Sequence, residues 1–390
     1  MRASTVLSMR LGALAPVARG ATLNMFVGNL VPPASIYSLE FDDETNDFKV
    51  LRNNTAHSSH AWIAFDHAKE NIYGSSLNTS TLANYRVLNE TTIELTHSIT
   101  ATGSCTNTTS PFVTAMSSEP YLVFSASWPD PNACAMSLST SRTGAVDRVL
   151  DTWSYINTSG IHGLALSPTP QRNPPHHNRT GHRQQLIYSA DLNGDFLWTH
   201  SIDLATGRAA EVARFAVSPG THPRHLAVHP NGERLYAVHE SANSVAEYAL
   251  DEATGAVRAE VVSHPLIPPG VDPERYWSAE VMLGPPGATV AGGRYLWATA
   301  RARDDDAVGY VSVFLVGADG GIVERMLRVP TTTRGEYAAM TDYPEGYVLL
   351  WKLDGRRERA DGLVEYRNAM AVARADVGDG GCCANAIWYS

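Results

Sequence analysis

The sequence predicts an all-β fold, a seven-bladed β-propeller with four-stranded blades, and three observations support this prediction. Strands of five to seven residues recur along the chain, separated by turns among which 30 glycines and 22 prolines are spread. The turns that end at Gly207 and Gly255 close two successive units, which sets the repeat at about 50 residues. The strands alternate in polarity and show no helical periodicity. A repeat of this length made of short strands is typical of a propeller blade.

The repeated unit is clearest at Leu226–Val238, which has the pattern of a strand, a tight turn and a second strand. Ile63–Gly74 repeats this pattern with the same turn length, and Leu164–Ser189 repeats it with a polar insertion. Each unit continues into a third alternating strand, as at Ser244–Leu250 and Phe196–Ile202. The chain is therefore expected to be built from copies of one supersecondary unit.

Counting the innermost strand of each unit predicts seven blades. These strands are expected to begin near residues 60, 111, 161, 223, 279, 335 and 384. Met25–Leu30 and Ser35–Phe41 have the pattern of second and third strands with no first strand before them, whereas Asn385–Tyr389 resembles a first strand with nothing after it. We therefore expect the two ends of the chain to share a blade and close the ring without an open sheet edge.

Because blades add radially to one ring, a chain of 390 residues can form one domain. We expect this domain to span residues 23–390, after a possible signal or leader segment at residues 1–22 whose apolar stretch Arg10 interrupts. No apolar run approaches the roughly 18 residues that a membrane-spanning helix needs. The sequence leaves the oligomeric state open.

Charge and motif content restrict the classes of function. The formal charge of −10, from 40 acidic and 30 basic residues, argues against nucleic acid or an anionic membrane surface as a partner. No P-loop, Rossmann glycine fingerprint, HExxH, GxSxG or CxxC motif occurs in the chain. We therefore expect neither a cofactor nor a metal ion.

Sequons and cysteines indicate the compartment. Six Asn-x-Ser/Thr sequons lie in the first half of the chain, at Asn53, Asn78, Asn89, Asn107, Asn157 and Asn178. They favour a glycosylated protein of the secretory pathway or the extracellular space, with a cytoplasmic protein that has Ser/Thr/Asn-rich loops as the alternative. Cys105 and Cys134 are expected to join two loops by a disulfide. The pairing of the adjacent Cys382 and Cys383 is left open.

The repeats also predict which ionisable side chains meet. Superposing Leu164–Leu166 on Leu226–Val228 places His162 and Arg224 at one equivalent position, two residues before the apolar core of the inner strand. Inner strands of a propeller line the central channel, so equivalent positions in neighbouring blades face a common axis. His162 and Arg224 are therefore expected to point into the channel.

A second pair follows from the neighbouring strands. Superposing Tyr236 on Trp297 places Glu240 and Arg301 at one equivalent position. The sequence thus predicts four catalytic residues at one mouth of the channel: His162, Arg224, Glu240 and Arg301. The alternative, that these are charged groups at solvated strand ends, stays open.

Other residues have weaker support. His60, which precedes an inner strand, His222 and Trp297 are predicted to bind substrate. His225 and His229 are expected to be packing or turn residues. Asp191 lies one position away from the register of Glu240 and is expected to be a turn or inter-blade hydrogen-bond acceptor, and Asp304–Asp306 is expected to be a solvated loop.

Nine segments in a shared order and spacing connect the chain to a known family, from about residue 25 to the C-terminus. They are Phe41–Asp43, Phe65–His67, Asn71–Gly74, Gly160–Gly163, Tyr188–Leu192, Leu197–His200, His222–Arg224, His264–Gly270 and Asn385–Tyr389. In these segments the chain resembles the fungal 3-carboxy-cis,cis-muconate cyclases. The resemblance implies a seven-bladed propeller without a metal, and a site of one His, two Arg and one Glu that fall on the four residues selected by the repeats.

The chain also departs from that family. Gly103–Thr109 stands where the family has a His-Pro-Arg segment, and Thr331–Gly335 replaces a longer loop that contains a histidine. Carboxymuconate carries three carboxylates and needs cationic groups to hold them, so losing a His and an Arg weakens this assignment. Muconate degradation is intracellular, whereas the sequons indicate the secretory pathway. We therefore expect a member of the family that has been redirected to another cyclisation.

The expected function is ring closure of a small unsaturated organic substrate by a cofactor-independent cyclase, for example a hetero-Diels–Alder step in fungal secondary metabolism. The first alternative is the lactonisation of 3-carboxy-cis,cis-muconate. In that reaction Arg224 and Arg301 would stabilise negative charge on oxygen, and His162 or Glu240 would transfer the proton. The second alternative, from another class, is a non-catalytic propeller that serves as a binding scaffold.

Overall fold

The computed structural model describes most of the chain. The described residues are 20–128, 133–156, 158–168, 171–172, 183–284, 293–304, 307–329, 337–342, 346–355, 357–358, 364–365, 368–378 and 383–389. The first 19 residues of the expected leader lie outside this set. The first described strand, β1, begins at Thr22, one residue before the expected start of the domain.

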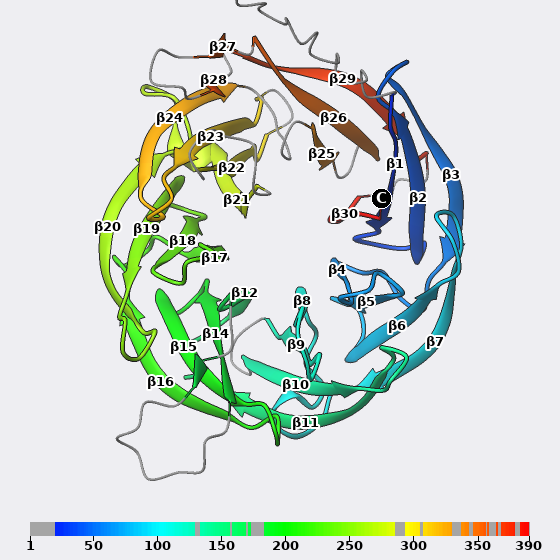
Figure 1. Ribbon diagram of the computed structural model, residues 1–390, viewed down its shortest axis with the longest axis vertical. Coiled ribbons are helices and arrows are strands. Elements are labelled where there is room, and N and C mark those ends of the chain that lie inside the picture. Colours follow the sequence, from blue (N-terminus) through cyan, green and yellow to red (C-terminus); the bar gives the residue numbers. More distant parts are fainter. Residues whose placement is uncertain are drawn as a thin grey trace, which may run out of the picture.

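The protein is an all-β propeller of antiparallel blades (Figure 1). In the described residues, six sheets have four or more strands and another has three. Three successive sheets are β4 (Trp62–Phe65), β5 (Asn71–Ser75), β6 (Thr81–Val87) and β7 (Ile93–Thr100); β8 (Phe112–Ala115), β9 (Val123–Ala126), β10 (Cys134–Thr140) and β11 (Val146–Ser154); and β12 (Ile161–Leu166), β14 (Arg183–Asp191), β15 (Phe196–Asp203) and β16 (Ala209–Ala216), with β13 (Gln171–Arg172) on β14.

Three further sheets continue the ring. They are β17 (Pro223–Val228), β18 (Arg234–His239), β19 (Ser244–Leu250) and β20 (Val257–Pro265); β21 (Tyr276–Leu283), β22 (Arg294–Ala302), β23 (Tyr310–Val316) and β24 (Ile322–Val329); and the three-stranded β25 (Tyr337–Asp342), β26 (Tyr347–Asp354) and β29 (Asn368–Asp376). The remaining elements are the hairpin of β27 (Arg357–Glu358) and β28 (Val364–Glu365) and the 3-10 helices η1 (Gly103–Cys105) and η2 (Pro273–Arg275). None of the described helices is long and apolar enough to span a membrane.

Strands from both ends of the chain share one sheet, in the order β3 (Asp47–Thr55), β2 (Ser35–Asp42), β1 (Thr22–Gly28) and β30 (Ala386–Trp388). β30 pairs antiparallel with β1, and Met25 lies opposite Trp388. The Asn385 side chain accepts a hydrogen bond from Ile63 N at 2.7 Å and donates one to Ile63 O at 2.9 Å. It thereby attaches this sheet to the inner strand β4 of the next blade.

The inner strands begin close to the predicted positions. The strands nearest the axis in Figure 1 start at residues 62, 112, 161, 223, 276, 337 and 386. Period and turn pattern locate these strands well because each blade repeats the same hairpin geometry. The middle strands are the most buried, as in β5, where all five residues are buried between neighbouring blades.

Buried tyrosines at equivalent positions join several blades to the blades that follow them. Tyr73 in β5 and Tyr188 in β14 donate hydrogen bonds to Gly144 O at 2.6 Å and Gly255 O at 2.8 Å. Each glycine lies in the outermost hairpin of the following blade. Burial raises the pKa of both tyrosines, which stay neutral donors. These contacts satisfy the phenol groups inside an apolar interface and fix the angle between blades.

The predicted disulfide is confirmed. Cys105 in η1 and Cys134 in β10 are bonded, and their Cα atoms lie 5.6 Å apart. Cys383 is also disulfide-bonded, whereas Cys382 lies outside the described residues. The side chains of four sequons, Asn53, Asn78, Asn89 and Asn107, are exposed; those of Asn157 and Asn178 lie outside the described residues.

Candidate active site

Three neighbouring inner strands share an irregularity at the same height. The pairing register shifts between Ile161 and Gly163 in β12, between Pro223 and His225 in β17, and between Ser278 and Val281 in β21. A bulge of this kind turns a side chain away from the regular pleat, and bulges are common beside active sites. The residues left without a partner by these shifts are His162, Arg224, Ala279 and Glu280.

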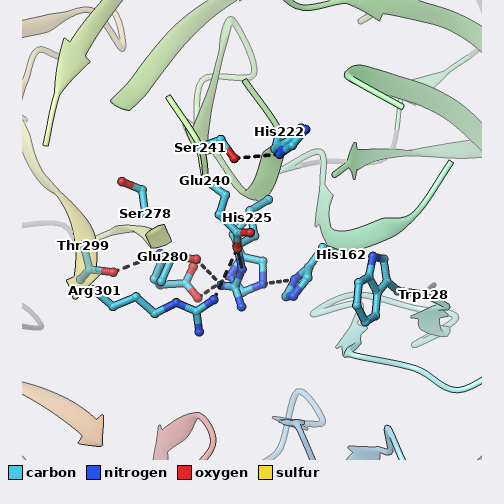
Figure 2. A network of polar contacts seen from close by, with 12 residues as sticks. Trp128, His162, His222, His225, Glu240, Ser241, Ser278, Glu280, Thr299 and Arg301 are labelled. Carbon is cyan, nitrogen blue, oxygen red and sulfur yellow. Dashed lines mark hydrogen bonds and ion pairs between the residues drawn. The ribbon is translucent and has the colours of Figure 1, made fainter. Parts of the chain in front are cut away.

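A cluster of two guanidiniums around one carboxylate forms at this height (Figure 2). Arg224 Nε lies 2.9 Å from Glu240 Oε2, and Arg301 Nη2 lies 3.5 Å from the same oxygen. The Arg224–Glu240 contact is an ion pair without an aligned hydrogen bond from Nε. Arg224 Nη1 donates to Ala279 O at 2.5 Å, which fixes the guanidinium across two blades. The structure thus brings together three of the four predicted catalytic residues in direct contact.

The fourth predicted residue, His162, begins a second chain of contacts. His162 Nδ1 lies 3.0 Å from His225 Nε2, and His225 Nδ1 lies 2.6 Å from Glu280 Oε2. Figure 2 shows His162, His225 and Glu280 close together, with Glu240 and Arg301 beside them. The His225 ring packs edge-on against Trp62, with ring centroids 4.8 Å apart, and also against Phe112.

Gly163 makes the contact between the two histidines possible. A Cβ atom at this position would lie 2.6 Å from Arg224 O and 2.8 Å from a ring carbon of His225. Both distances are too short for a real contact, so only glycine lets β12 approach β17 this closely.

Burial and charge hold both histidines neutral. Desolvation, reinforced by the positive charge of Arg224, lowers the pKa of His162 and of His225 well below the usual range. Desolvation raises the pKa of Glu280 to about 8, although Arg224 opposes this shift. The pKa of Arg224 falls to about 10 for the same reason, and the guanidinium remains charged at neutral pH.

Arg301 is the most accessible member of the cluster. Its side chain is 46% exposed, against 13% for Arg224 and 12% for Glu240. The Arg301 guanidinium stacks on the exposed ring of Trp277 at 5.1 Å, and Arg303 stacks on the same ring at 4.3 Å. Arg301 is therefore the guanidinium best placed to meet an anionic ligand.

The structure does not bring the three predicted substrate-binding residues into this network. His60 is fully buried, and its ring nitrogens lie 3.0 Å from Ser75 O and 2.6 Å from Tyr85 Oη, which leaves neither for a substrate. Trp297 is 3% exposed within an apolar cluster between blades. Both side chains are enclosed by neighbouring blades in this structure, and their role as substrate contacts stays a prediction.

His222 lies near the site but outside the contact network. Its Nδ1 is 2.8 Å from Ser241 Oγ, and Figure 2 shows this pair apart from the His162–Glu280 chain. His222 has a positive φ of 56°, and its backbone N donates to Asp195 Oδ1 at 2.8 Å. Its role as a substrate contact stays a prediction.

Sequence reasoning missed His225 and Glu280. In three blades an inner-strand residue pairs with an aromatic residue of the next strand: Ala165 with Tyr188, Ala227 with Tyr236 and Met282 with Trp297. Two residues before these pairs lie Gly163, His225 and Glu280, which therefore occupy one equivalent position. This position comes directly after that of His162 and Arg224. His225 was expected only to pack. It does pack on aromatic rings, but it also bridges His162 and Glu280. Extending the superposition by one residue and one blade would have found both.

Other expectations for charged residues are met. Asp191 accepts hydrogen bonds from Gly160 N at 2.8 Å and Trp198 Nε1 at 3.0 Å, as expected for an acceptor at the end of a strand. His229 lies in a turn with Nδ1 3.4 Å from Asn231 N. Asp304 is half exposed and pairs with Arg275, and residues 305–306 lie outside the described set.

Within the described part of the chain, no three His, Cys, Asp or Glu side chains come together as ligands for a metal ion.

Comparison with known proteins gives the family. The family model described as "Lactonase, 7-bladed beta-propeller" matches residues 24–340. Carboxy-cis,cis-muconate cyclase of Neurospora crassa is 30% identical over 392 residues, which cover 94% of this chain and 99% of that protein. A 6-phosphogluconolactonase of Pectobacterium carotovorum is 28% identical over 200 residues, which cover 50% of this chain and 54% of the relative.

Solved structures show the same fold. The periplasmic gluconolactonase of Pseudomonas aeruginosa superposes with a TM-score of 0.70 at 16% identity, covering 95% of this chain and 99% of that one. A putative 6-phosphogluconolactonase of Bacteroides uniformis gives a TM-score of 0.68 at 17% identity, covering 94% and 99%. The chain therefore belongs to the seven-bladed lactonase β-propeller family, as a lactonase-type enzyme of the carboxymuconate cyclase-like group.

Proposed function

We propose that this protein is a cofactor-independent cyclase that closes a ring on a small unsaturated acid by proton transfer. The observation that carries the proposal is a neutral imidazole, His162, within electrostatic reach of an accessible guanidinium, Arg301. The contact to His225 uses His162 Nδ1 and leaves Nε2 as the nitrogen that can meet a substrate. A proton donor and an anion-binding group side by side are what the addition of a carboxylate to a double bond requires.

The charges of the site favour a substrate with few carboxylates. Glu240 neutralises one of the two guanidiniums that contact it. With Glu280 protonated at neutral pH, the cluster carries a net charge of about +1. One carboxylate balances that charge, whereas three would leave anionic groups unpaired in a partly buried site. We therefore place the substrate among unsaturated monoacids rather than tricarboxylates such as carboxymuconate.

In the proposed reaction Arg301 holds the substrate carboxylate next to one end of a carbon–carbon double bond. An oxygen lone pair of that carboxylate forms the new carbon–oxygen bond while the π electrons take up the His162 Nε2 proton at the neighbouring carbon, and His162 gains a proton at Nδ1 from the side of His225, so that it stays neutral. The channel contributes by holding the substrate folded for ring closure. Arg224, fixed by Glu240 and Ala279 O, supplies a constant positive potential for charge that develops on oxygen.

The histidine chain favours this reaction over the hetero-Diels–Alder closure expected from the sequence. A concerted cycloaddition needs shape and a hydrogen-bond donor but no proton transfer. Two neutral histidines in line with a carboxyl group provide a hydrogen-bonded route for a proton, which proton-transfer ring closure uses and a concerted cycloaddition does not. A binding scaffold without catalytic activity would not need this route either.

Deuterium incorporation tests the proposed function. We expect the purified protein in D₂O to convert an unsaturated monoacid faster than cis,cis-muconate, and cis,cis-muconate faster than 3-carboxy-cis,cis-muconate. Each lactone should carry one deuterium on the carbon next to the new carbon–oxygen bond, as NMR and mass spectrometry would show. A lactone without deuterium, or no ring closure with any of these dienoic acids, would contradict the proposal.

We also propose that the ring contains seven blades and that the shared terminal sheet closes it. The three-stranded sheet of β25, β26 and β29 supplies the blade between β24 and the sheet of β30. The pairing of β1 with β30 and the Asn385 hydrogen bonds to Ile63 support closure at this point.

We further propose that the protein passes through the secretory pathway. The Cys105–Cys134 disulfide and the exposure of the four described sequon asparagines support this location over the cytoplasm. When the protein is expressed in a eukaryotic secretory host, we expect peptide-N-glycosidase F to increase its mobility on a denaturing gel. Unchanged mobility after treatment would remove the support from glycosylation and favour the cytoplasmic alternative.

A further inference from the structure

We propose that His225 and Glu280 form a proton relay behind His162, in which Glu280 stores the proton that His162 delivers and sets the tautomer that His162 presents to the substrate. This inference deepens the proposed function and rests on His162 as its proton donor. His225 and Glu280 act through His162 and are positioning residues.

The relay follows from the hydrogen-bonding capacity of neutral imidazole. Each neutral ring has one N–H donor and one acceptor nitrogen. The 2.6 Å contact from Glu280 Oε2 to His225 Nδ1 and the 3.0 Å contact from His225 Nε2 to His162 Nδ1 place the three groups in series. The proton on Glu280 therefore determines both tautomers.

Two states of the chain are possible. When Glu280 is protonated it donates to His225 Nδ1, His225 Nε2–H donates to His162 Nδ1, and His162 Nε2 carries a proton. When Glu280 is ionised it accepts from His225 Nδ1–H, His225 Nε2 accepts from His162 Nδ1–H, and His162 Nε2 bears a lone pair. The first state makes His162 an acid toward substrate, and the second makes it a base.

The surroundings keep charge off the histidines and place the proton on Glu280. His225 is 2% exposed and is enclosed by the rings of Trp62 and Phe112, which disfavours an imidazolium. The titratable and charged groups that face the chain are His162 from β12, Arg224 from β17, Glu240 after β18 and Arg301 from β22. Arg224 repels a second positive charge on either ring, while burial favours protonated Glu280 at neutral pH.

Glu280 is also the member of the relay that can take up a new proton from solvent. Its side chain is 25% exposed, whereas His225 is closed to water. Glu280 Oε1 accepts a hydrogen bond from Val281 N at 3.0 Å, which holds the carboxyl group in the plane that presents Oε2 to His225. The carboxyl group therefore has one oxygen anchored to the backbone, one oxygen on the relay, and access to solvent.

The transfer conserves atoms and charge. The proton on His162 Nε2 moves to the substrate carbon as the carboxylate oxygen forms its bond. In the same displacement the His225 Nε2 proton moves to His162 Nδ1, the Glu280 proton moves to His225 Nδ1, and Glu280 becomes the carboxylate. Substrate anion and Glu280 acid thus become neutral lactone and Glu280 carboxylate. Water then returns one proton to Glu280.

The tautomers can be measured without any substrate. In the full-length protein labelled with ¹⁵N-histidine, we expect the His162 and His225 resonances, assigned with the His162→Gln and His225→Gln variants, to exchange tautomer as pH rises through about 8. Neither ring should become an imidazolium in that range. In Glu280→Gln the tautomers should not change with pH, because the amide does not titrate. The matched control Glu274→Gln, an exposed residue of η2, should behave as wild type.

Kinetics provide a second measurement. The rate of ring closure should be highest below pH 8 and fall as pH rises through about 8, since Glu280 then loses the proton that it supplies. Glu280→Gln should lower kcat on the order of 10- to 10²-fold with little change in KM and remove this pH dependence. Glu280→Asp keeps a carboxyl group, so it should have a higher rate than Glu280→Gln and should retain the pH dependence. Glu274→Gln should change neither the rate nor the pH dependence.

The outcomes separate the relay from the proposed function. Histidine tautomers that stay constant across pH 8 in the wild type, or that switch equally in Glu280→Gln, would overturn the relay even where ring closure is observed. A tautomer switch that depends on Glu280, in a protein that closes no ring on the dienoic acids, would support the relay and contradict the proposed function. If Glu280→Gln fails to fold, the pH dependence of the histidine tautomers in the wild type and the rate and pH dependence of Glu280→Asp still test the relay.

Discussion

Replacing Arg301 by Ala is expected to lower kcat/KM for ring closure on the order of 10²-fold. Arg301 is 46% exposed and lies 3.5 Å from Glu240, so much of its hydrogen-bonding capacity is open to a ligand. Its loss removes the guanidinium that holds the substrate carboxylate, and both KM and kcat should deteriorate. Steady-state kinetics with an unsaturated monoacid would measure the change.

Arg303→Ala is the matched control for this prediction. Arg303 carries the same charge two residues further along and stacks on the same Trp277 ring, but it contacts Glu274 O rather than Glu240. Its removal should change kcat/KM by only a few-fold through the general electrostatic potential. If kcat/KM falls equally in the two variants, Arg301 acts through its net charge alone, and the predicted direct contact with substrate is wrong.

Replacing His162 by Ala is expected to lower kcat on the order of 10² to 10⁴-fold, because general acid catalysis contributes that much to proton-transfer reactions. Any lactone that the variant still forms in D₂O should carry one deuterium, as in the wild type. A concerted cycloaddition would tolerate this change, since it requires no proton donor. The size of the His162 effect therefore distinguishes the two kinds of ring closure.

His97→Gln controls for the loss of a histidine elsewhere. His97 lies exposed on the outer strand β7, away from the contact network, and its replacement should leave the rate unchanged. If His162→Ala folds normally, as near-UV circular dichroism would show, and retains wild-type kcat, His162 is not the proton donor.

The repeated blade explains why so much of the fold and site could be predicted. Inner strands obey one local pattern, so their starts could be located to within about three residues in every blade, from residue 62 to residue 386. The same repetition placed His162 with Arg224 and Glu240 with Arg301, because equivalent positions around a ring face a common axis. The Cys105–Cys134 disulfide was predictable from the oxidising compartment that the sequons indicate, and the structure places both residues in one blade.

Burial could not be predicted by the same means. His60 and Trp297 precede or follow channel-lining strands in the sequence, but the contact of neighbouring blades encloses both. A strand alternates its side chains between two faces, and in a propeller both faces of a middle strand are covered. Sequence position alone does not distinguish the channel from this interface.

By itself the sequence determined the repeat, the strands and the disulfide, and it selected four of the side chains found in the contact networks, because each depends on local pattern and on position within a blade. The tertiary structure decided that His162 meets His225 and that His225 meets Glu280, because these contacts cross three blades and depend on bulges and on the missing Cβ of Gly163. Packing distances between strands 55 or more residues apart are set by the whole ring. Whether a histidine only packs or also conducts a proton is a property of that packing.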